Sequence, residues 1–487
     1  MRNVIRRVFF PVVSLLAACS GGSSGPTGPS GPPVVTLVNG ATLPSGTVGT
    51  TVVIQGSNFG TTQAIAAGHV LFSTTAGGRD TATIAAGADW TNNLIVTTVP
   101  AGVPQGTDTL FVKTSGGVSS PVIFTVLKAV TFNPSTISWT STTALPVGLS
   151  GHAIAAATLP GVTPTSVVYV VGGGKDSTNA PRDSVLYATV SSTGTVGAWT
   201  KTTVLPAPVA FAAALVATPA NSPVTGSSYL YVIGGDSTAS GKPVATVYLG
   251  TLSATGAVTG WATTTALPAP VHSVGAAIFN GNVYVAGGSG TGNAPVATVY
   301  RAAINSDGTL GAWQALTALP FARSYFGFGV NGTFLYALGG DSAAVSPNDS
   351  SVKGSAISDV VYAQIDVRTG NLVAGGWIAN GNKLKKAVSK HTAVVAGGNV
   401  LITAGLYSGA SSGATEESYA ALNADGSTGA FNGATGSNTI SSAGGGNLFN
   451  HAATGYLDGS GAFHVLVVGG DDVNTPTVAK HTGVFYH

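Results

Sequence analysis

The chain has 487 residues and a formal net charge of +2, and only 7% of its side chains are charged, against roughly 25% in ordinary soluble domains. Three of its eight arginines lie in the first seven residues, so the remainder is close to neutral. Without a basic stripe to neutralise phosphates, nucleic-acid binding is not expected. The apolar content of 44% is ample for a packed core, and the Gly- and Thr-rich spacing favours many short strands.

Residues 1–18 have the layout of a secretory signal peptide. A cationic start precedes an apolar run, 8–18, that is too short to span a bilayer. The stretch Leu16-Ala17-Ala18-Cys19 resembles the bacterial lipobox. That resemblance implies cleavage before Cys19, diacylation of Cys19, and an exported protein anchored to the membrane by lipid. Ser20, where an inner-membrane retention signal has Asp, favours the outer membrane, on its periplasmic side or at the cell surface.

Residues 19–33 are rich in Gly, Ser and Pro and are predicted to be a flexible, partly extended tether. From residue 34 the chain alternates in short β-like runs separated by Gly- and Pro-bearing turns, which is typical of an antiparallel sandwich. The phrase IQGSNFG at 54–60, with VTTVP at 96–100, resembles an IPT/TIG domain. The resemblance covers 34–127 and implies an immunoglobulin-like spacer or docking module.

Beyond residue 128 one short phrase recurs, as in YVVGGG at 169 and YVIGGD at 231. Gly-Gly pairs begin at 172, 234, 287, 339 and 469, and Ala404-Gly405 fills the one large gap. A Tyr or Phe strand follows each pair, and a Trp or Phe follows that strand in the first five repeats. Repeats of this length indicate a propeller or a solenoid, and this order resembles the kelch repeat. The resemblance covers 128–487 and implies a six-bladed β-propeller.

The last repeat lacks a Trp strand, whereas an orphan one, ISWTSTTALP at 137–146, precedes the first repeat. We therefore expect the segment near 130–140 to supply the outer strand of the last blade, so that strands from both ends of the chain close the ring. Closure leaves no long exposed edge. The expected fold is all-β, an Ig-like sandwich followed by a six-bladed kelch propeller.

Four histidines lie near the start of a predicted innermost strand, and repeat symmetry predicts that they surround the mouth of a central channel: His152, His272, His391 and His451. Histidine can bind metals or hydrogen-bond sugars. Histidine at this point of a kelch repeat can equally serve local hydrogen bonding. No HxH or HExxH spacing accompanies the four, so neither a metal nor another cofactor is expected.

Further polar residues follow the Gly-Gly pairs or lie near the same predicted face: Asp176, Arg182, Asp236, Arg323, Asp341, Asp471 and Asp472. They are candidates for a polar binding mouth, although Asp also favours turns for purely local reasons. The loop 341–358 is the longest after any Gly-Gly pair. A long loop on such a face often sets specificity.

Three functions remain open. A surface-anchored propeller that binds a protein or glycan ligand fits the whole layout. An enzyme resembling N-acetylneuraminate epimerase is an alternative, but the two glutamates, Glu416 and Glu417, are neighbours on a predicted strand and point to opposite faces. No catalytic residue is therefore assigned. Copper-radical oxidase chemistry needs a Cys–Tyr cross-link, and the only cysteine is Cys19. The third possibility is a scaffold in an envelope complex.

Overall fold

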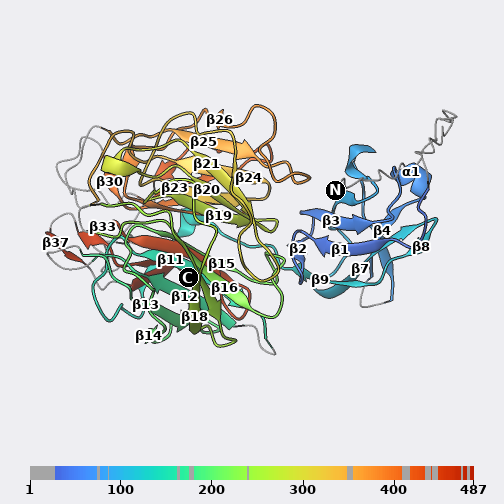
Figure 1. Ribbon diagram of the computed structural model, residues 1–487, viewed down its shortest axis with the longest axis horizontal. Coiled ribbons are helices and arrows are strands. Elements are labelled where there is room, and N and C mark those ends of the chain that lie inside the picture. The colour runs from blue at the N-terminus through green and yellow to red at the C-terminus, as the bar shows by residue number, and fades with distance from the viewer. Residues whose placement is uncertain are drawn as a thin grey trace, which may run out of the picture.

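The computed structural model describes residues 28–73, 77–85, 87–161, 165–174, 180–238, 241–347, 355–407, 417–433, 440, 448–472, 475–479 and 483–486. Within these ranges the protein is almost entirely β and forms two units that lie side by side (Figure 1). The predicted signal peptide, Cys19, Asp176 and Glu416 lie outside the described residues. In the part of the chain that the structure describes, no helix has the length and hydrophobicity needed to cross a membrane.

The N-terminal unit consists of two sheets that share one core. The first sheet contains β1 (Val34–Val38), β3 (Thr51–Ser57) and β6 (Leu94–Thr98); the second contains β2 (Ser45–Thr47), β9 (Val122–Leu127), β7 (Gly106–Thr114), β4 (His69–Ser73), β5 (Arg79–Thr81) and β8 (Gly117–Val118). Short helices α1 (Gln63–Ala66) and η1 (Gly87–Asp89) lie between strands. Residues two apart, such as Val70 and Phe72, are both fully buried, because alternate side chains of a strand face the same side. Ile54 of one sheet and Phe124 of the other belong to the same cluster.

The end of the predicted tether packs onto this unit. Asn58 donates from Nδ2 to the Pro32 carbonyl at 3.3 Å and accepts a hydrogen bond from Ser30 at 3.4 Å. The position of Gly116 leaves no room for a Cβ, which would lie 2.3 Å from the Gly31 carbonyl oxygen. Residues 28–33 are therefore part of the folded unit, in contrast to the free tether expected over 19–33.

The larger unit contains, among the described residues, six four-stranded antiparallel sheets, which we number in order along the chain. They are β11 (Ala153–Leu159), β12 (Thr165–Val171), β13 (Val185–Thr189), β14 (Thr200–Lys201); β15 (Ala213–Ala217), β16 (Ser228–Ile233), β17 (Val247–Leu252), β18 (Val258–Thr264); β19 (Gly275–Phe279), β20 (Asn282–Ala286), β21 (Val299–Ala303), β22 (Gln314–Ala315); β23 (Gly327–Asn331), β24 (Phe334–Leu338), β25 (Val360–Gln364), β26 (Ile378–Ala379); β28 (Thr392–Ala396), β29 (Asn399–Thr403), β31 (Ser418–Ala421), β32 (Asn432–Gly433); and β34 (Ala452–Leu457), β35 (Phe463–Val468), β38 (Gly483–Tyr486), β10 (Trp139–Ser141).

Short strands and turns complete the unit. They are β27 (Val388–Ser389) paired with β30 (Leu406–Tyr407), β36 (Asp471–Asp472) between β33 (Leu448–Phe449) and β37 (Thr475–Ala479), and the single turns η2 (Pro134–Thr136) and η3 (Thr291–Asn293). β10 pairs with β38, with Trp139 opposite Tyr486 and Ser141 opposite Val484. The segment before the first repeat thus supplies the outer strand of the sixth sheet, as the orphan Trp strand predicts.

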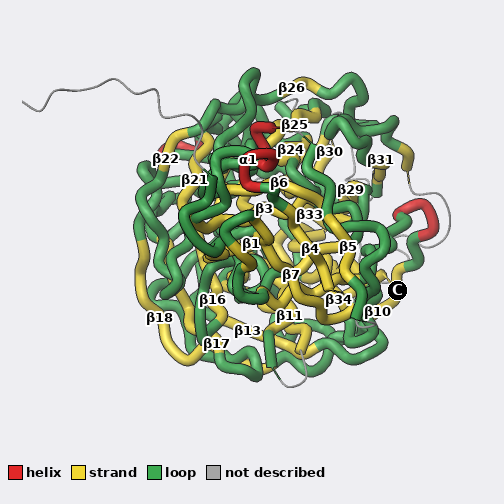
Figure 2. The backbone as a smooth tube through the Cα atoms, turned by 90° about the vertical axis from the view of Figure 1, so that its right-hand side faces the viewer, coloured by secondary structure: helices red, strands yellow, loops and turns green. Residues whose placement is uncertain are grey.

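The six sheets contact one another in sequence. The first strand of each sheet packs beside the first strand of the next, and β34 of the sixth sheet packs beside β11 of the first. Viewed from the side of the N-terminal unit, the outer strands β18, β22, β26 and β10 lie at the periphery, and β31, the third strand of the fifth sheet, lies between β26 and β10 (Figure 2). Each pair of adjacent sheets shares a hydrophobic cluster.

The double glycine joins each sheet to its neighbour. The N–H of the second glycine, as at Gly235, donates to the Val271 carbonyl of the next sheet at 2.9 Å. A Cβ on Gly234 would lie 2.4 Å from the same oxygen, and Gly234 has a φ of +61°, so a side chain is excluded. The same link recurs at all six junctions, through Gly173–Val209, Gly235–Val271, Gly288–Arg323, Gly340–Val388, Gly405–Leu448 and Gly470–Leu149. The last of these ties the sixth sheet to the first.

The repeated aromatics add further links between neighbouring sheets. Tyr231 donates from its hydroxyl to the Gly308 carbonyl at 2.5 Å, and Tyr284 to the Gly370 carbonyl at 2.7 Å. Four tryptophans donate from Nε1 to a threonine carbonyl near the outer strand of the preceding sheet, at 2.9–3.0 Å: Trp199, Trp261, Trp313 and Trp377. The repeated phrase therefore encodes inter-sheet hydrogen bonds as well as core packing.

The two units contact each other directly. Thr42 donates from Oγ1 to the Val224 carbonyl at 2.8 Å, and the Leu43 N–H donates to the Pro219 carbonyl at 2.7 Å. Arg368 of the larger unit forms an ion pair with Asp89 of the smaller. These contacts lie at hairpins between β15 and β16 and between β25 and β26, which are at the end of the larger unit opposite the double glycines.

Candidate functional site

The six first strands surround a cavity of about 490 Å³. Its lining contains no Asp, Glu, Lys or Arg and consists mostly of Ala, Gly, Val and Phe. A second, smaller cavity of about 140 Å³ lies where the first strands begin. It shares wall residues with the larger one, among them His152, His391 and His451. The smaller cavity is the candidate site because its wall carries polar and aromatic side chains.

One residue of each sheet, just before its first strand, lines the small cavity with a left-handed backbone of φ +52° to +58°. We call these six residues the ring: Gly151, Phe211, Ser273, Tyr325, Lys390 and Asn450. Five backbone hydrogen bonds join neighbouring ring residues, and only Ser273 and Tyr325 are not joined in this way. The N–H of Phe211, for example, donates to the Gly151 carbonyl at 2.6 Å. The N–H of Gly151 donates to the Asn450 carbonyl at 2.8 Å, which links the first sheet to the sixth.

The side chains of the ring are unusual for this backbone. Glycine adopts a left-handed conformation freely, as Gly151 does, whereas other residues lose roughly 1–2 kcal/mol each. Bulky residues at such φ values are outliers, and Phe211, Tyr325 and Lys390 are three of them at one cavity. Strained residues cluster at functional sites, where surrounding structure enforces them. The ring thus has large side chains at a position where glycine would have the least backbone strain.

Aromatic and cationic groups meet on one side of the ring. The rings of Phe211 and Tyr325 are edge to face with centroids 5.9 Å apart, and His272 lies 5.8 Å from Tyr325. The Nζ of Lys390 is 5.2 Å from the centroid of Tyr325 and 5.9 Å from that of Phe449. Burial raises the pKa of Tyr325 well above its ordinary value, so the phenol stays neutral. The cavity wall therefore offers an aromatic surface, an ammonium group and, from Asn450, an amide.

The predicted histidines do not form one symmetric set. His152, His391 and His451 each follow a ring residue directly, whereas His272 precedes one, so its place in the repeat is different. All four are buried. His391 Nε2 lies 3.1 Å from the Leu338 carbonyl, and His451 Nε2 lies 2.9 Å from Thr403 Oγ1. Both contacts reach the residue just before the double-glycine position of the preceding sheet, so these two histidines act as inter-sheet links, the local role that the sequence left open.

Burial also fixes the charge of these histidines. It lowers the pKa of His152 and of His391 to about 3, with a smaller effect from the nearby His451, and it lowers the pKa of His451 to about 4. All three are therefore neutral at physiological pH. They supply neither a cation nor a titrating group to the cavity.

His272 pairs with Asp236, which directly follows the double glycine of the second sheet. His272 Nδ1 lies 3.7 Å from Asp236 Oδ2, and both residues are almost fully buried. Burial raises the pKa of Asp236 to about 7 and lowers that of His272 to about 4. Because the acid has the higher pKa, the proton stays on Asp236 and the pair is uncharged between these values. This contact is therefore not an ion pair.

Neither Arg182 nor Arg323 is among the described residues that line the two cavities. Arg323 is fully buried and donates from one terminal nitrogen to the carbonyls of Gly339 and Asp359, each at 3.2 Å. Burial lowers its pKa to about 10, so it remains a cation that holds its own sheet. Arg182 is half-buried, and its N–H donates to the Gly173 carbonyl at 2.9 Å.

The remaining predicted aspartates are buried close to the ring. Asp471 Oδ2 accepts a hydrogen bond from Asn450 Nδ2 at 3.3 Å, and Asp341 Oδ1 accepts one from Ser355 at 2.9 Å. Burial raises the pKa of Asp471 to about 6, although hydrogen bonds from Asn450 and Ser150 oppose the shift. Asp472 is buried in the short strand β36. Asp236, Asp341 and Asp471 hold the same place in three repeats, directly after the double glycine.

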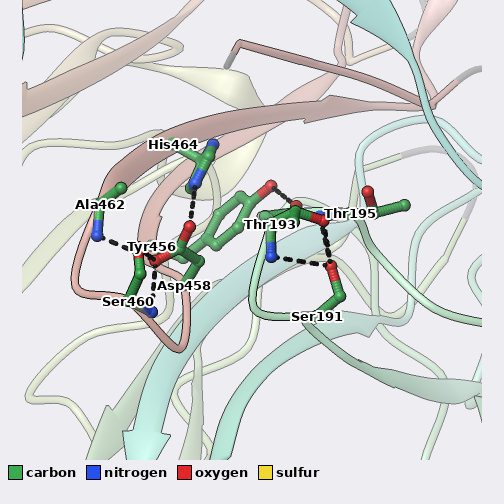
Figure 3. A network of polar contacts seen from close by, with 9 residues as sticks. Ser191, Thr193, Thr195, Tyr456, Asp458, Ser460, Ala462 and His464 are labelled. Carbon is green, nitrogen blue, oxygen red and sulfur yellow. Dashed lines mark hydrogen bonds and ion pairs between the residues drawn. The ribbon is translucent and has the colours of Figure 1, made fainter.

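A polar cluster outside the cavity joins the sixth sheet to the first (Figure 3). His464 lies with Nε2 3.0 Å from Asp458 Oδ2, and Tyr456 donates to the Gly194 carbonyl at 2.6 Å. Burial alone would raise the pKa of Asp458, but hydrogen bonds from His464, Ser460 and Ala462 lower it to about 2. The sequence reasoning missed this cluster, which stabilises the junction and leaves no group directed to a cavity.

Within the described residues, no three His, Cys, Asp or Glu side chains are grouped closely enough to hold a metal ion. A scan against protein-family models finds no match. A search of the curated proteins also finds none. The function must therefore be argued from the residues of the site alone.

The ring residues themselves were missed from sequence. Aligning the repeats on the double-glycine position would have placed only Ser273, Tyr325 and Lys390 in one column, 14 residues before it. Gly151, Phe211 and Asn450 lie 21, 23 and 19 residues before it, because the hairpin between the first two strands is longer in those sheets. The signal was the presence of chemically different side chains at that column within an otherwise regular repeat. Their left-handed backbone has no sequence signature when the residue is Phe, Tyr or Lys.

Proposed function

We propose that the larger unit is a six-bladed kelch β-propeller, closed by β10 and β38, and that the smaller unit is an Ig-like IPT/TIG sandwich. The cyclic set of double-glycine hydrogen bonds supports this arrangement, because the link from Gly470 to Leu149 joins the last sheet to the first. The shared core of the two N-terminal sheets supports the sandwich. The lipobox-like segment supports export and a lipid anchor at Cys19, in the outer membrane.

We further propose that this propeller is a binding protein for a compact, oxygen-rich ligand such as a terminal sugar of a glycan. The observation that carries the proposal is the ring, where Phe211, Tyr325 and Lys390 keep left-handed backbones around one cavity. Aromatic faces contact the C–H faces of sugars, and polar groups fix the orientation of a ligand in such pockets. A volume of about 140 Å³ limits the occupant to roughly one small ring.

The experiment compares the purified protein with its Phe211→Gly variant on a glycan array, alongside a pull-down from envelope extract. Glycine occupies the equivalent position at Gly151, so the variant is expected to fold with an unchanged or higher melting temperature and to lose the glycan signal. The matched control is Asn280→Gly, which replaces another left-handed residue, with φ +47°, away from the ring. A glycan signal that persists in Phe211→Gly would place the ligand elsewhere. A protein partner without any glycan signal would favour an adhesion module, and silence in both assays would favour a scaffold.

A further inference from the structure

One serine of the ring is hydrogen-bonded to a buried histidine, and an asparagine holds the other side of that histidine. Ser273 lines the small cavity, and its Oγ lies 3.0 Å from His272 Nδ1. On the far side of the imidazole, His272 Nε2 lies 3.1 Å from Asn293 Oδ1. His272 is fully buried, whereas Ser273 is only half-buried. The three side chains therefore form one hydrogen-bonded chain that ends at the cavity wall.

Asn293 determines which imidazole nitrogen of His272 carries the proton. Because an amide oxygen only accepts hydrogen bonds, His272 Nε2 donates to Asn293 Oδ1, and Nδ1 presents its lone pair to Ser273. Asp236 Oδ2 is 3.7 Å from the same Nδ1, too far for a good hydrogen bond. Burial lowers the pKa of His272 to about 4, so the imidazole is neutral at physiological pH. A serine hydroxyl beside such a lone pair has a base that can take its proton.

The backbone of Ser273 is strained and firmly held. Its φ is +52°, a conformation that residues other than glycine rarely adopt. The N–H of Ser273 donates to the Phe211 carbonyl at 2.8 Å, and His272 exchanges two backbone hydrogen bonds with Ser289, at 2.8 and 2.9 Å. Nucleophilic serines of other folds also lie on strained turns that present Oγ to the substrate. The strain at Ser273 thus has a chemical explanation that a purely structural serine would not need.

A neutral phenol lies at the same wall of the cavity. Tyr325 lines the small cavity, and burial raises the pKa of its hydroxyl well above the ordinary value, although the nearby Ser273 offsets a little of that rise. Among the described residues, no partner forms a geometrically good hydrogen bond with Tyr325 Oη. A buried hydroxyl that keeps its proton can donate to an oxygen that becomes negative next to Ser273. A nucleophile, its base and an oxyanion donor are thus present at one cavity.

We propose that the small cavity is an acyl-transfer site in which Ser273 is the nucleophile, His272 the general base and Tyr325 the donor to the oxyanion. Its substrate is an ester of a small acyl group such as acetate, because a volume of about 140 Å³ leaves little room beyond that group. Ser273 Oγ bonds to the carbonyl carbon, its proton passes to His272 Nδ1 and on to the leaving alcohol, and the C–O bond to that alcohol breaks. Water then attacks the acyl-serine, gives a proton through His272 to Ser273 Oγ, and releases the acid. This activity goes beyond the proposed binding and does not depend on its ligand.

The nucleophile is tested by treating the whole folded protein with methanesulfonyl fluoride, a probe small enough for the cavity, and mapping the adducts by mass spectrometry. Ser273 Oγ bonds to sulfur, fluoride leaves, and His272 takes the proton. The exposed Ser306 is the internal reference. We expect Ser273 to react at least roughly a hundredfold faster than Ser306, the lower end of what general-base catalysis contributes, because a base with a lowered pKa is weak. Equal reaction of the two serines would overturn the proposal.

Asn293 is a positioning residue, and a pair of variants tests its role in the same assay. Asn293→Gly accepts the φ of +59° and removes the acceptor for His272, so we expect the labelling of Ser273 to slow about tenfold, as the loss of one hydrogen bond implies. Asn293→Asp restores an acceptor and is expected to recover the rate. The control Asn280→Gly is expected to leave it unchanged. An undiminished rate in Asn293→Gly would refute the activation of Ser273 through His272.

The reaction itself is tested with p-nitrophenyl acetate, by comparing the natural protein with Ser273→Gly. The variant removes the hydroxyl and relieves the left-handed strain, so we expect it to fold and to lose the release of p-nitrophenol. The same rate of release in both proteins would overturn the acyl-transfer activity. Neither probe is a sugar, so a negative result here leaves the glycan-array test of the proposed binding function unaffected, and the two proposals fail separately.

Discussion

Asp236 offers the sharpest test of the electrostatics at this end of the larger unit. Its side chain is 2% exposed, and among the described residues neither carboxylate oxygen has a hydrogen-bond partner. Its neighbour His272 is itself neutral, because burial lowers the pKa of His272 to about 4. Burial raises the pKa of Asp236 from 3.8 to about 7. Between pH 3.8 and about 7, the folded protein therefore keeps a proton on Asp236 that the unfolded chain releases. The free energy of unfolding falls as the pH rises through this range.

The magnitude follows from the size of that shift. A rise of about three pKa units at ~1.4 kcal/mol each gives an upper estimate of ~4 kcal/mol lost from the free energy of unfolding once the pH exceeds 7. Asp236→Asn removes the charge and keeps the shape. We expect the variant to unfold at higher urea concentration than the natural protein at about pH 8, with a smaller gain at about pH 5, because the carboxyl of the unfolded chain already ionises above 3.8.

Asp307→Asn is the control for this prediction. Asp307 is fully exposed, and hydrogen bonds from Thr309 lower its pKa, so its replacement is expected to bring no gain at high pH. If Asp236→Asn instead lowered stability equally at both pH values, Asp236 would be making a favourable contact as an anion. The account of an unpaired buried carboxyl would then be refuted.

Three further predictions concern the links between sheets. A chain ending at residue 476 loses β38 and with it the partner of β10; we expect it to be insoluble or to melt far below the full chain, and a native-like melt would contradict closure by both ends. Tyr284→Phe removes the hydroxyl that bonds the Gly370 carbonyl and should cost about 1 kcal/mol in urea unfolding, unlike Tyr187→Phe on a half-buried third strand. His391→Ala should cost roughly 2–4 kcal/mol at neutral pH. Because His391 has a lowered pKa, the natural protein should lose stability as the pH falls from 6.5 toward 3, and the variant should lose less over that range.

The strand content and the inter-sheet roles of the repeated residues were predictable from sequence. Glycine pairs, a following Tyr strand and a later Trp constrain packing strongly, because each fills a place that few other residues can fill. The pairing of β10 with β38 followed from counting, since one Trp strand was missing at the end and one was unpaired at the start. Predictions of this kind succeed because they depend on backbone geometry that every repeat shares.

The site was less predictable because it depends on how the repeats differ. The four histidines looked equivalent in spacing, yet His272 lies on the other side of a ring residue from His152. Arg323 looked like a ligand-face cation, but the position it occupies points into its own sheet. The sequence did not predict Lys390 as a site residue, because a lysine before a strand is ordinarily solvent-exposed. Only the contacts with Ser346 and Pro347 reveal that it is buried.

The six ring residues share one left-handed backbone conformation but differ in side-chain chemistry. If the ring position served folding alone, glycine would be the least costly residue in all six sheets, since it removes about 1–2 kcal/mol of left-handed strain per site. Glycine occurs there only once, at Gly151, while Phe211, Tyr325, Lys390 and Asn450 bring four different chemical groups to one cavity. This strain at one cavity, under a loop that Lys390 and Asn450 contact, supports the proposal that the cavity is a recognition site.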